Sequence, residues 1–170
     1  MRHLCAAVLC VTLVCMAASR LPAQTSAAGA AARADQPIAL WGSLSLGPGN
    51  ASNRAGARLG AQAAVFGSYG PWAFGVRRGA ASGFDSGGTY DDALLVGYRR
   101  LAPHATLIVL TGPARIYDES TGDGRVALGF AAEAGANLRF VGVGVSTFGA
   151  WRPGLSYIGV GLTLDAGFIR

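Results

Sequence analysis

The chain of 170 residues carries little charge and contains no lysine. Charged residues make up 14% of it, hydrophobic residues make up 51%, and every basic residue is an arginine. These arginines are scattered and do not gather on one segment, so the formal net charge of +5 does not indicate nucleic-acid binding. The apolar run 4–18 is shorter than the roughly 20 residues that a transmembrane helix requires.

Cysteine is confined to the first fifteen residues, at Cys5, Cys10 and Cys15. The residues before Cys10 and Cys15 are not small, which argues against a lipoprotein site. If the N-terminal segment is removed, the mature chain has neither disulfides nor thiol chemistry, whatever the redox state of its compartment.

The N-terminus has the three parts of a secretory signal peptide. Arg2 is the positive charge, residues 4–18 form the apolar core, and small residues follow. We predict a signal peptide at 1–24, with cleavage between about 19 and 32, and a flexible lead-in at 25–36. The alternative is a signal anchor that is not cleaved.

From residue 37 onward, the sequence lacks any helical period of useful length. Apolar and polar residues instead alternate with period two, and Gly, Pro, Asn and Asp interrupt the alternation. The pattern predicts eight strands, at about residues 37–47, 57–67, 71–80, 90–100, 104–112, 125–134, 138–149 and 156–168.

Long and short connections alternate between these predicted strands. GPGNASNRAG follows the first strand and SYG follows the second, and the rhythm continues to the end of the chain. Outer-membrane barrels have short periplasmic turns and longer outer loops, so the rhythm favours such a barrel. An even number of strands also places both ends of the domain on the periplasmic side.

Each strand has one face of large apolar side chains and one face of small or polar side chains. In the last strand, Leu162 and Leu164 alternate with Thr163 and Asp165. A small transmembrane barrel needs this arrangement, because large apolar groups face lipid and the narrow interior accepts small or polar ones. The fifth strand is apolar on both faces and fixes no register.

A shift of one residue would turn four charges toward lipid, namely Arg77, Arg99, Glu133 and Asp165. A lipid-facing arginine at the bilayer midplane costs roughly 2–4 kcal/mol, and an acidic residue costs less. The fold class predicted for residues 37–170 is therefore all-β, an eight-stranded antiparallel up-and-down transmembrane barrel. The alternative from another class is a secreted soluble β-barrel whose large apolar residues line a site for a small apolar ligand.

The inward charges predict a polar interior in two layers. We expect an ionic cluster near the periplasmic end, which plugs the barrel and consists of Arg99, Glu133, Asp165 and Thr163. A second layer nearer the outside consists of Arg58, Gln62 and Arg77. The functional alternative for the cluster is a proton or ion path.

Outward aromatic residues near the periplasmic strand ends predict an aromatic girdle of Trp72, Tyr98 and Phe168. Trp41 does not fit this girdle, because it shares parity with Ser43 and Ser45.

In these features, the chain resembles the small outer-membrane barrels of the OmpX and OmpA-barrel kind. The last strand matches their C-terminal assembly strand in its alternating residues Val160, Leu162, Leu164, Ala166 and Phe168. The match departs at the end, since Ile169 and Arg170 follow the aromatic residue. The resemblance implies the outer membrane of a bacterium with two membranes, with membrane lipids and the barrel-assembly machinery as partners.

Catalysis has little support in the sequence. The lipid A-modifying enzymes of this architecture use a histidine near the outer leaflet, whereas His104, which alone remains in the mature chain, lies in a predicted periplasmic turn. No spacing of metal ligands is visible, and no cofactor is expected. We therefore expect a non-enzymatic structural or surface-interaction role without a conducting pore. The charged outer loops, which include Asp91, Asp92 and Arg115, would serve adhesion or contact with lipopolysaccharide, or would merely be solvated.

Overall fold

The computed structural model describes residues 38–83, 87–102, 104–138 and 140–168. The predicted signal peptide 1–24 and lead-in 25–36 lie outside the described residues, as do Ile169 and Arg170. The side chain of Phe168 is also outside the description.

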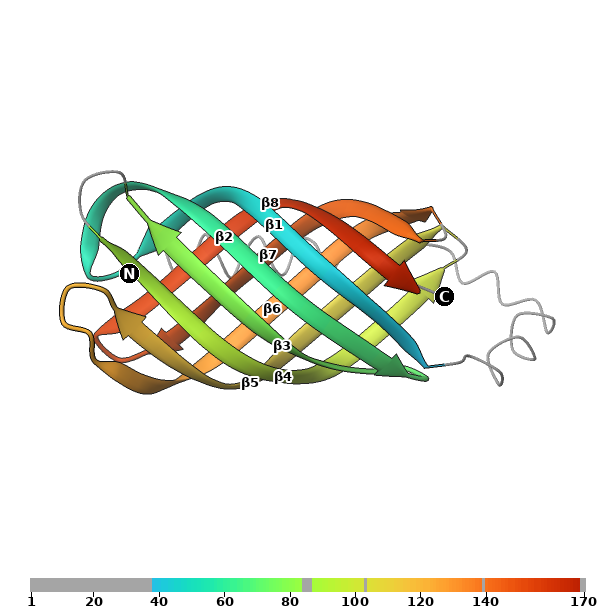
Figure 1. The fold of residues 1–170 in the computed structure, drawn as a ribbon, viewed down its shortest axis with the longest axis horizontal. Helices are drawn as coiled ribbons and strands as arrows, with labels where there is room; N and C mark the ends of the chain where they lie inside the picture. The colour runs from blue at the N-terminus through green and yellow to red at the C-terminus, as the bar shows by residue number, and fades with distance from the viewer. Residues whose placement is uncertain (1–37, 84–86, 103, 139, 169–170) are drawn as a thin grey trace. The chain divides into compact units, whose positions relative to one another are not determined.

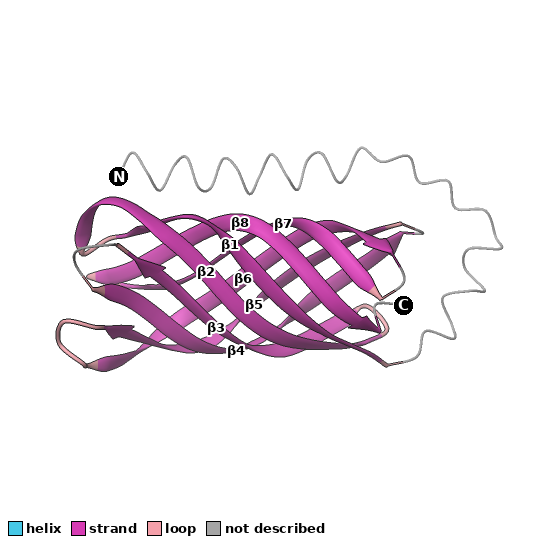
Figure 2. Ribbon diagram, turned by 45° about the horizontal axis from the view of Figure 1, so that its top comes forward, coloured by secondary structure: helices cyan, strands magenta, loops and turns pink. Residues whose placement is uncertain are grey.

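Eight antiparallel strands form one closed barrel in chain order, and the last strand pairs with the first (Figures 1 and 2). This confirms the predicted fold class. The strands are β1 (Ala39–Ala51), β2 (Arg54–Tyr69), β3 (Trp72–Ser82), β4 (Gly88–Ala102), β5 (Ala105–Asp118), β6 (Gly124–Leu138), β7 (Val141–Arg152) and β8 (Leu155–Phe168).

The two ends of the barrel differ in their connections. At the terminal end, where β1 begins and β8 ends, the connections are 70–71, 103–104 and 139–140. At the opposite end, which we call the loop end, they are 52–53, 83–87, 119–123 and 153–154.

The predicted long loops are shorter in the structure, because many of their residues belong to strands. The segment GPGNASNRAG was expected to be a loop, but Gly49 pairs with Arg58 and Ala51 pairs with Arg54. Likewise, Thr89 pairs with Asp118 between β4 and β5. Gly, Pro and Asn residues mark turns in sequence statistics, yet they remain in a strand when each neighbour supplies a backbone partner.

Two prolines lie within strands, at positions where the ladder is interrupted. Pro48 pairs with β2, but the pairing of β1 with β8 skips from Leu46 to Gly49. Pro113 pairs with β6, and the pairing of β5 with β4 skips from Thr111 to Ala114. Proline has no backbone N–H to donate, so these interruptions are where a strand tolerates it.

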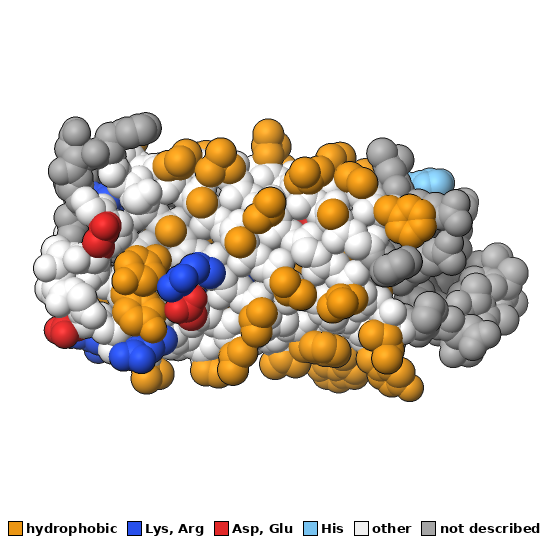
Figure 3. Space-filling view, viewed as in Figure 1, with side chains coloured by type: hydrophobic (Ala, Val, Ile, Leu, Met, Phe, Trp, Pro, Cys, Tyr) orange, Lys and Arg blue, Asp and Glu red, His pale blue; other side chains and the backbone are white. Residues whose placement is uncertain are grey.

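The alternation of faces follows the predicted register. Large apolar side chains are exposed on all eight strands, and Leu162 is 76% exposed. Arg77, Arg99 and Glu133 are buried inside the barrel. In Figure 3, hydrophobic side chains are spread along most of the length of the visible face, while most basic and acidic side chains lie toward one end.

The interior is not restricted to small and polar groups, which corrects the expectation from the sequence. Trp41, Phe66 and Phe148 are fully buried, together with Leu110 and Ile116. Trp41 packs against Phe66 with ring centroids 5.6 Å apart.

Glycine makes room for these rings. A Cβ on Gly75 would collide with the ring of Phe66, and one on Gly159 would collide with the ring of Phe148. The glycines on the inward face therefore compensate in volume for the aromatic side chains, as close packing requires.

Candidate functional site

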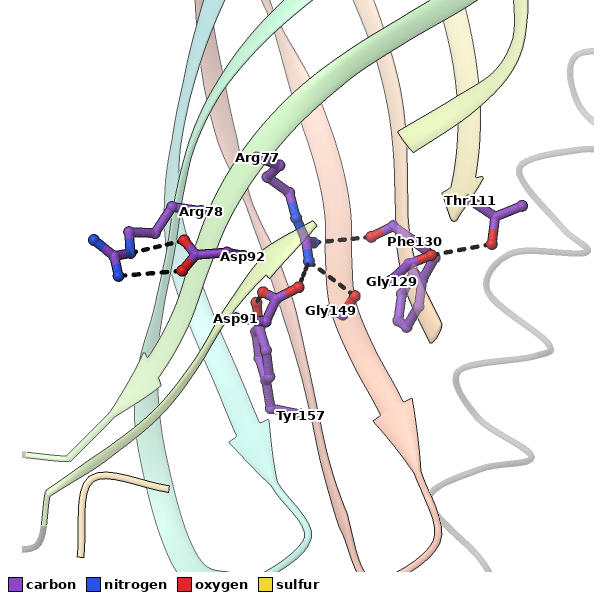
Figure 4. A network of polar contacts seen from close by, with 9 residues as sticks. All are labelled: Arg77, Arg78, Asp91, Asp92, Thr111, Gly129, Phe130, Gly149 and Tyr157. Carbon is purple, nitrogen blue, oxygen red and sulfur yellow. Dashed lines mark hydrogen bonds and ion pairs between the residues drawn. The ribbon is translucent and has the colours of Figure 1, made fainter. Parts of the chain in front are cut away.

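A buried polar network lies inside the barrel on the side of the loop end. Arg77 on β3 forms an ion pair with Asp91 on β4, and neither side chain is exposed. The same guanidinium donates to the carbonyl oxygens of Phe130 (2.9 Å) and Gly149 (3.1 Å), and the hydroxyl of Tyr157 donates to Asp91 (Figure 4). The network connects β3, β4, β6, β7 and β8 across the lumen.

Arg77 was expected in the second interior layer, but Asp91 and Tyr157 were not among the predicted site residues. The sequence contained the signal for Asp91, because it shares parity with the inward residues Ala93 and Leu95. The predicted strand 90–100 already contains Asp91, so following its inward parity to the start of the strand would have placed this carboxylate inside the barrel. Tyr157 has the same parity as Gly159 and Thr163.

A second network surrounds Glu133 on β6. Its Oε1 accepts hydrogen bonds from Ser43 Oγ (3.0 Å) and Gln62 Nε2 (2.9 Å). Gln62 also donates to Ser45 Oγ, which lies 2.8 Å from Thr163 Oγ1. Glu133, Asp165 and Thr163 line one small internal cavity together with Thr106 and Ile108.

Arg99 does not join these carboxylates, which corrects the predicted ionic cluster. It donates to Ser68 Oγ at 2.6 Å, and its guanidinium carbon lies 4.8 Å from the ring centroid of Trp41. Among the residues that the structure describes, no ion pair connects Arg99 to Glu133 or Asp165. Alternation along a strand predicts whether a side chain points inward or outward. It does not predict the position of that side chain along the barrel axis, which depends on the shear of the barrel. Inward residues were therefore grouped although they do not meet.

The predicted second layer is divided in the same way. Gln62 belongs to the network of Glu133, and Arg77 belongs to that of Asp91. Arg58 lies nearer the loop end and donates to the carbonyl oxygen of Gly87 at 3.0 Å. These three residues therefore belong to three separate sets of contacts and do not form one layer.

Aromatic residues gather on the outward face at the terminal end. Trp72 is directly opposite Tyr98 across β3 and β4, and it is also opposite Tyr69 across β2 and β3. All three side chains are more than half exposed. Tyr69 was not predicted, and the place of Phe168 in the girdle lies outside the described side chains.

In the last strand, Val160, Leu162, Leu164 and Ala166 are all exposed on the outward face. The strand pairs with β1 from Leu40–Phe168 to Ala51–Tyr157 and so closes the barrel.

The loop end is held together by hydrogen bonds between hairpins. Asn53, in the connection between β1 and β2, donates to Asp118 at the end of β5. The backbone N–H of Gly88 donates to the carboxylate of Glu119, and Glu119 N donates back to Gly88 O at 3.0 Å. The first of these contacts crosses the mouth of the barrel, since β1 and β5 lie on opposite sides of an eight-stranded cylinder.

A row of charged side chains lies on the outward face, toward the loop end. Arg78, Asp92 and Arg115 are cross-strand neighbours on β3, β4 and β5. Arg78 Nε lies 3.1 Å from Asp92 Oδ1. Figure 4 shows Arg78 and Asp92 on the opposite side of the wall from Arg77 and Asp91.

Two solved structures of outer-membrane proteins have similar folds. Neisserial surface protein A has 9% sequence identity and a TM-score of 0.52, and the match covers 77% of this chain and 97% of that one. Ail, the attachment invasion locus protein of Yersinia pestis, has 11% identity and a TM-score of 0.50, with 76% and 96% covered. No protein-family model matches the sequence, and no curated protein matches it either.

The chain has the fold of the small outer-membrane barrels. At these identities the likeness concerns the fold, so the roles of individual residues depend on the geometry of this barrel.

His104 lies in a short turn, as expected from the sequence. The residue is exposed in the connection between β4 and β5, at the terminal end of the barrel. The described residues contain no group of three His, Cys, Asp or Glu side chains placed to hold a metal ion.

Proposed function

We propose that this chain is a non-enzymatic outer-membrane barrel that presents the hairpins of its loop end as a surface for interaction. In this proposal the segment 1–24 directs export, and the last strand serves as the signal for the assembly machinery. The loop end then faces outside and the terminal end faces the periplasm. The exposed apolar wall is the observation that carries the proposal.

The wall supports a membrane location by its extent. Exposed large hydrophobic side chains occur on every strand, from Leu44 on β1 to Leu164 on β8. Soluble monomers rarely expose apolar patches larger than a few hundred Å². In a bilayer, the same surface is in contact with acyl chains, and the barrel leaves no strand edge unpaired.

The interior supports a role without conduction. Trp41, Phe66 and Phe148 are fully buried inside the barrel. The networks of Asp91 and Glu133 each connect opposite walls across the lumen. Eight strands enclose a lumen that side chains can fill. A soluble barrel with an apolar ligand inside would need its large apolar side chains, such as Leu162, to point into the barrel. These side chains instead point outward.

The loop end supports an interaction role because its hairpins are ordered by contacts with one another. Hydrogen bonds tie the connections 52–53 and 119–123 to strand ends, through Asn53 to Asp118 and through Glu119 to Gly88. A surface that is already ordered loses less conformational entropy when it binds a partner.

The proposal is tested with the full-length chain expressed in a Gram-negative host. We expect the protein in the outer-membrane fraction, with an unboiled band that migrates differently from the boiled band on a detergent gel. In planar bilayers, the purified folded protein should give no discrete conductance steps. A soluble protein without a gel shift would refute the membrane role, and regular channel openings would refute the plugged interior.

A further inference from the structure

The charged row on the outward face is unusual, because such residues are rarely turned toward lipid. Arg78 and Asp92 have side chains that are 67% and 49% exposed, and Arg115 is exposed beside them. One carboxylate therefore lies between two guanidinium groups, which leaves one positive charge in excess. Among the described residues, Asp92 pairs with Arg78 and no ion pair involves Arg115.

On β3, β4 and β5, the outward residues change in character at the charged row. Two residues closer to the terminal end, the same strands carry Val76, Leu94 and Pro113. Two residues closer to the loop end, β4 and β5 carry Tyr90 and Tyr117. A charge facing lipid costs roughly 2–4 kcal/mol at the midplane but about 0–1 kcal/mol near an interface, so this position fits the level of the lipid headgroups.

The two tyrosines hold the guanidinium groups against the wall. Their rings stack with centroids 4.9 Å apart and an angle of 15° between planes. The guanidinium carbon of Arg78 lies 5.7 Å from the centroid of Tyr90, and that of Arg115 lies 5.2 Å from the centroid of Tyr117. Cation–π contacts leave the N–H groups of an arginine free to donate to an anion.

A groove in the outer wall lies directly beside the charged row. Its volume is about 630 Å³, and it runs over β2 to β6. Small outward side chains at Ala63 and Pro113 form its floor, while Val76 and Leu94 border it. Its charged margin consists of Arg78, Asp92 and Arg115. An apolar groove that ends at two arginines and one carboxylate keeps an excess of positive charge at its margin, so it matches a molecule with an acyl chain attached to a phosphorylated head.

We propose that this face binds a phosphorylated glycolipid of the outer leaflet, of the lipid A class. A phosphate group is held between Arg78 and Arg115, and an acyl chain lies in the groove. Arginine is suited to phosphate, because its planar fork donates two parallel hydrogen bonds. The inference rests on the proposed placement in the outer membrane, and charge complementarity selects this occupant over an uncharged lipid.

The test measures lipid retention on the purified full-length barrel in detergent. Native mass spectrometry follows the binding of added bisphosphorylated lipid A and of the same lipid after enzymatic dephosphorylation. The double variant Arg78→Gln/Arg115→Gln should bind the phosphorylated lipid about tenfold more weakly or worse, because two charge-assisted hydrogen bonds are lost. Arg100→Gln is the matched control, since Arg100 is an exposed outward arginine on β4 at the terminal end, and it should bind as the wild type does.

Asp92→Asn gives a result in the opposite direction. It removes the carboxylate that competes for Arg78, so binding of lipid A should become several-fold tighter. This variant keeps the test decisive if the double variant fails to show the gel shift of a folded barrel. Unchanged binding in the Asn variant would then refute the proposal.

Three further outcomes would overturn the site. In the first, the wild type and a folded double variant bind lipid A equally well. In the second, the wild type binds the dephosphorylated lipid as tightly as the phosphorylated lipid. In the third, inorganic phosphate alone binds as tightly as the lipid. The last outcome would show that the groove contributes nothing. Because the binding is measured on purified protein, it can fail while fractionation still places the chain in the outer membrane, and the two failures are distinguishable.

Discussion

Asp91 and Asp92 are consecutive residues of β4, and their carboxylates hold arginines on opposite sides of the barrel wall. Asp92 is directly opposite Arg78 in the ladder, and both are exposed. Asp91 reaches diagonally to Arg77, because its direct partner is Gly79, and this pair is completely buried. The two ion pairs thus have the same chemistry and adjacent positions but different surroundings, which makes each a control for the other.

The first prediction uses this contrast. Asp91→Asn should lower the free energy of unfolding by about 3–5 kcal/mol, because it leaves the buried guanidinium of Arg77 without its counter-charge. Asp92→Asn should lower it by about 1 kcal/mol or less, as is typical of exposed pairs. Urea unfolding of the refolded barrel in lipid vesicles, followed by tryptophan fluorescence, measures both.

A double variant distinguishes the contribution of the ion pair from the cost of leaving one of its charges unpaired. Arg77→Met/Asp91→Leu removes both charges and should recover much of the stability lost in Asp91→Asn. If the two single asparagine variants were equally stable, the buried pair would not be the structural tie described above.

The second prediction concerns Gly79, whose missing side chain makes room for the network. A Cβ at this position would collide with the hydroxyl of Tyr157 and would also press on the carboxylate of Asp91. Gly79→Ala should therefore destabilise the barrel by about 1–3 kcal/mol, as overpacking does. Combining it with Tyr157→Phe should reduce the added cost, since the hydroxyl is the atom in the way. Additive losses in this cycle, measured by the same urea unfolding, would contradict the assignment.

The third prediction addresses Glu133, which has no basic partner among the described residues. Glu133→Gln keeps an acceptor oxygen for Ser43 and Gln62 and removes a buried charge near Asp165, so stability should be unchanged or about 1 kcal/mol higher. Glu133→Ala loses both hydrogen bonds and should cost about 1–3 kcal/mol. A glutamine variant as unstable as the alanine variant would indicate that the charge itself is needed, as in the ionic cluster expected from the sequence.

The fold and the facing of residues could be predicted from the sequence because both depend on local alternation. Leu162 and Leu164 alternate with Thr163 and Asp165, and a slip of one residue would place charge in lipid. The same reasoning predicts that Trp41 points inward, because it shares parity with Ser43 and Ser45. It does not predict that Trp41 packs against Phe66, which lies on another strand.

The heights of interior residues could not be predicted in this way. They depend on the shear of the barrel and on the exact strand ends, and neither is recorded in period-two alternation. Arg99 was grouped with Glu133 for this reason. Asp91 was grouped with the charged outer loops, although the predicted strand 90–100 contains it, because it lies at the start of that strand, next to the turn-like sequence DSGGT. Gly79 leaves the space that the side chain of Tyr157 occupies, but these residues are far apart in the chain. A local sequence pattern therefore does not predict this contact.

The last prediction tests the two environments of the tryptophans in a bilayer. Trp41 is buried inside the barrel at 2% exposure, whereas Trp72 is 61% exposed on the outward face at the terminal end. In single-tryptophan variants refolded into vesicles of brominated phospholipids, bromine should quench Trp72 strongly, and most strongly when it is attached near the headgroup. Trp41 should be nearly unaffected at every bromine depth, because the wall and the side chains around it keep lipid away. Equal quenching of the two residues would mean that the barrel does not enclose Trp41, and an unquenched Trp72 would remove the girdle from the membrane surface.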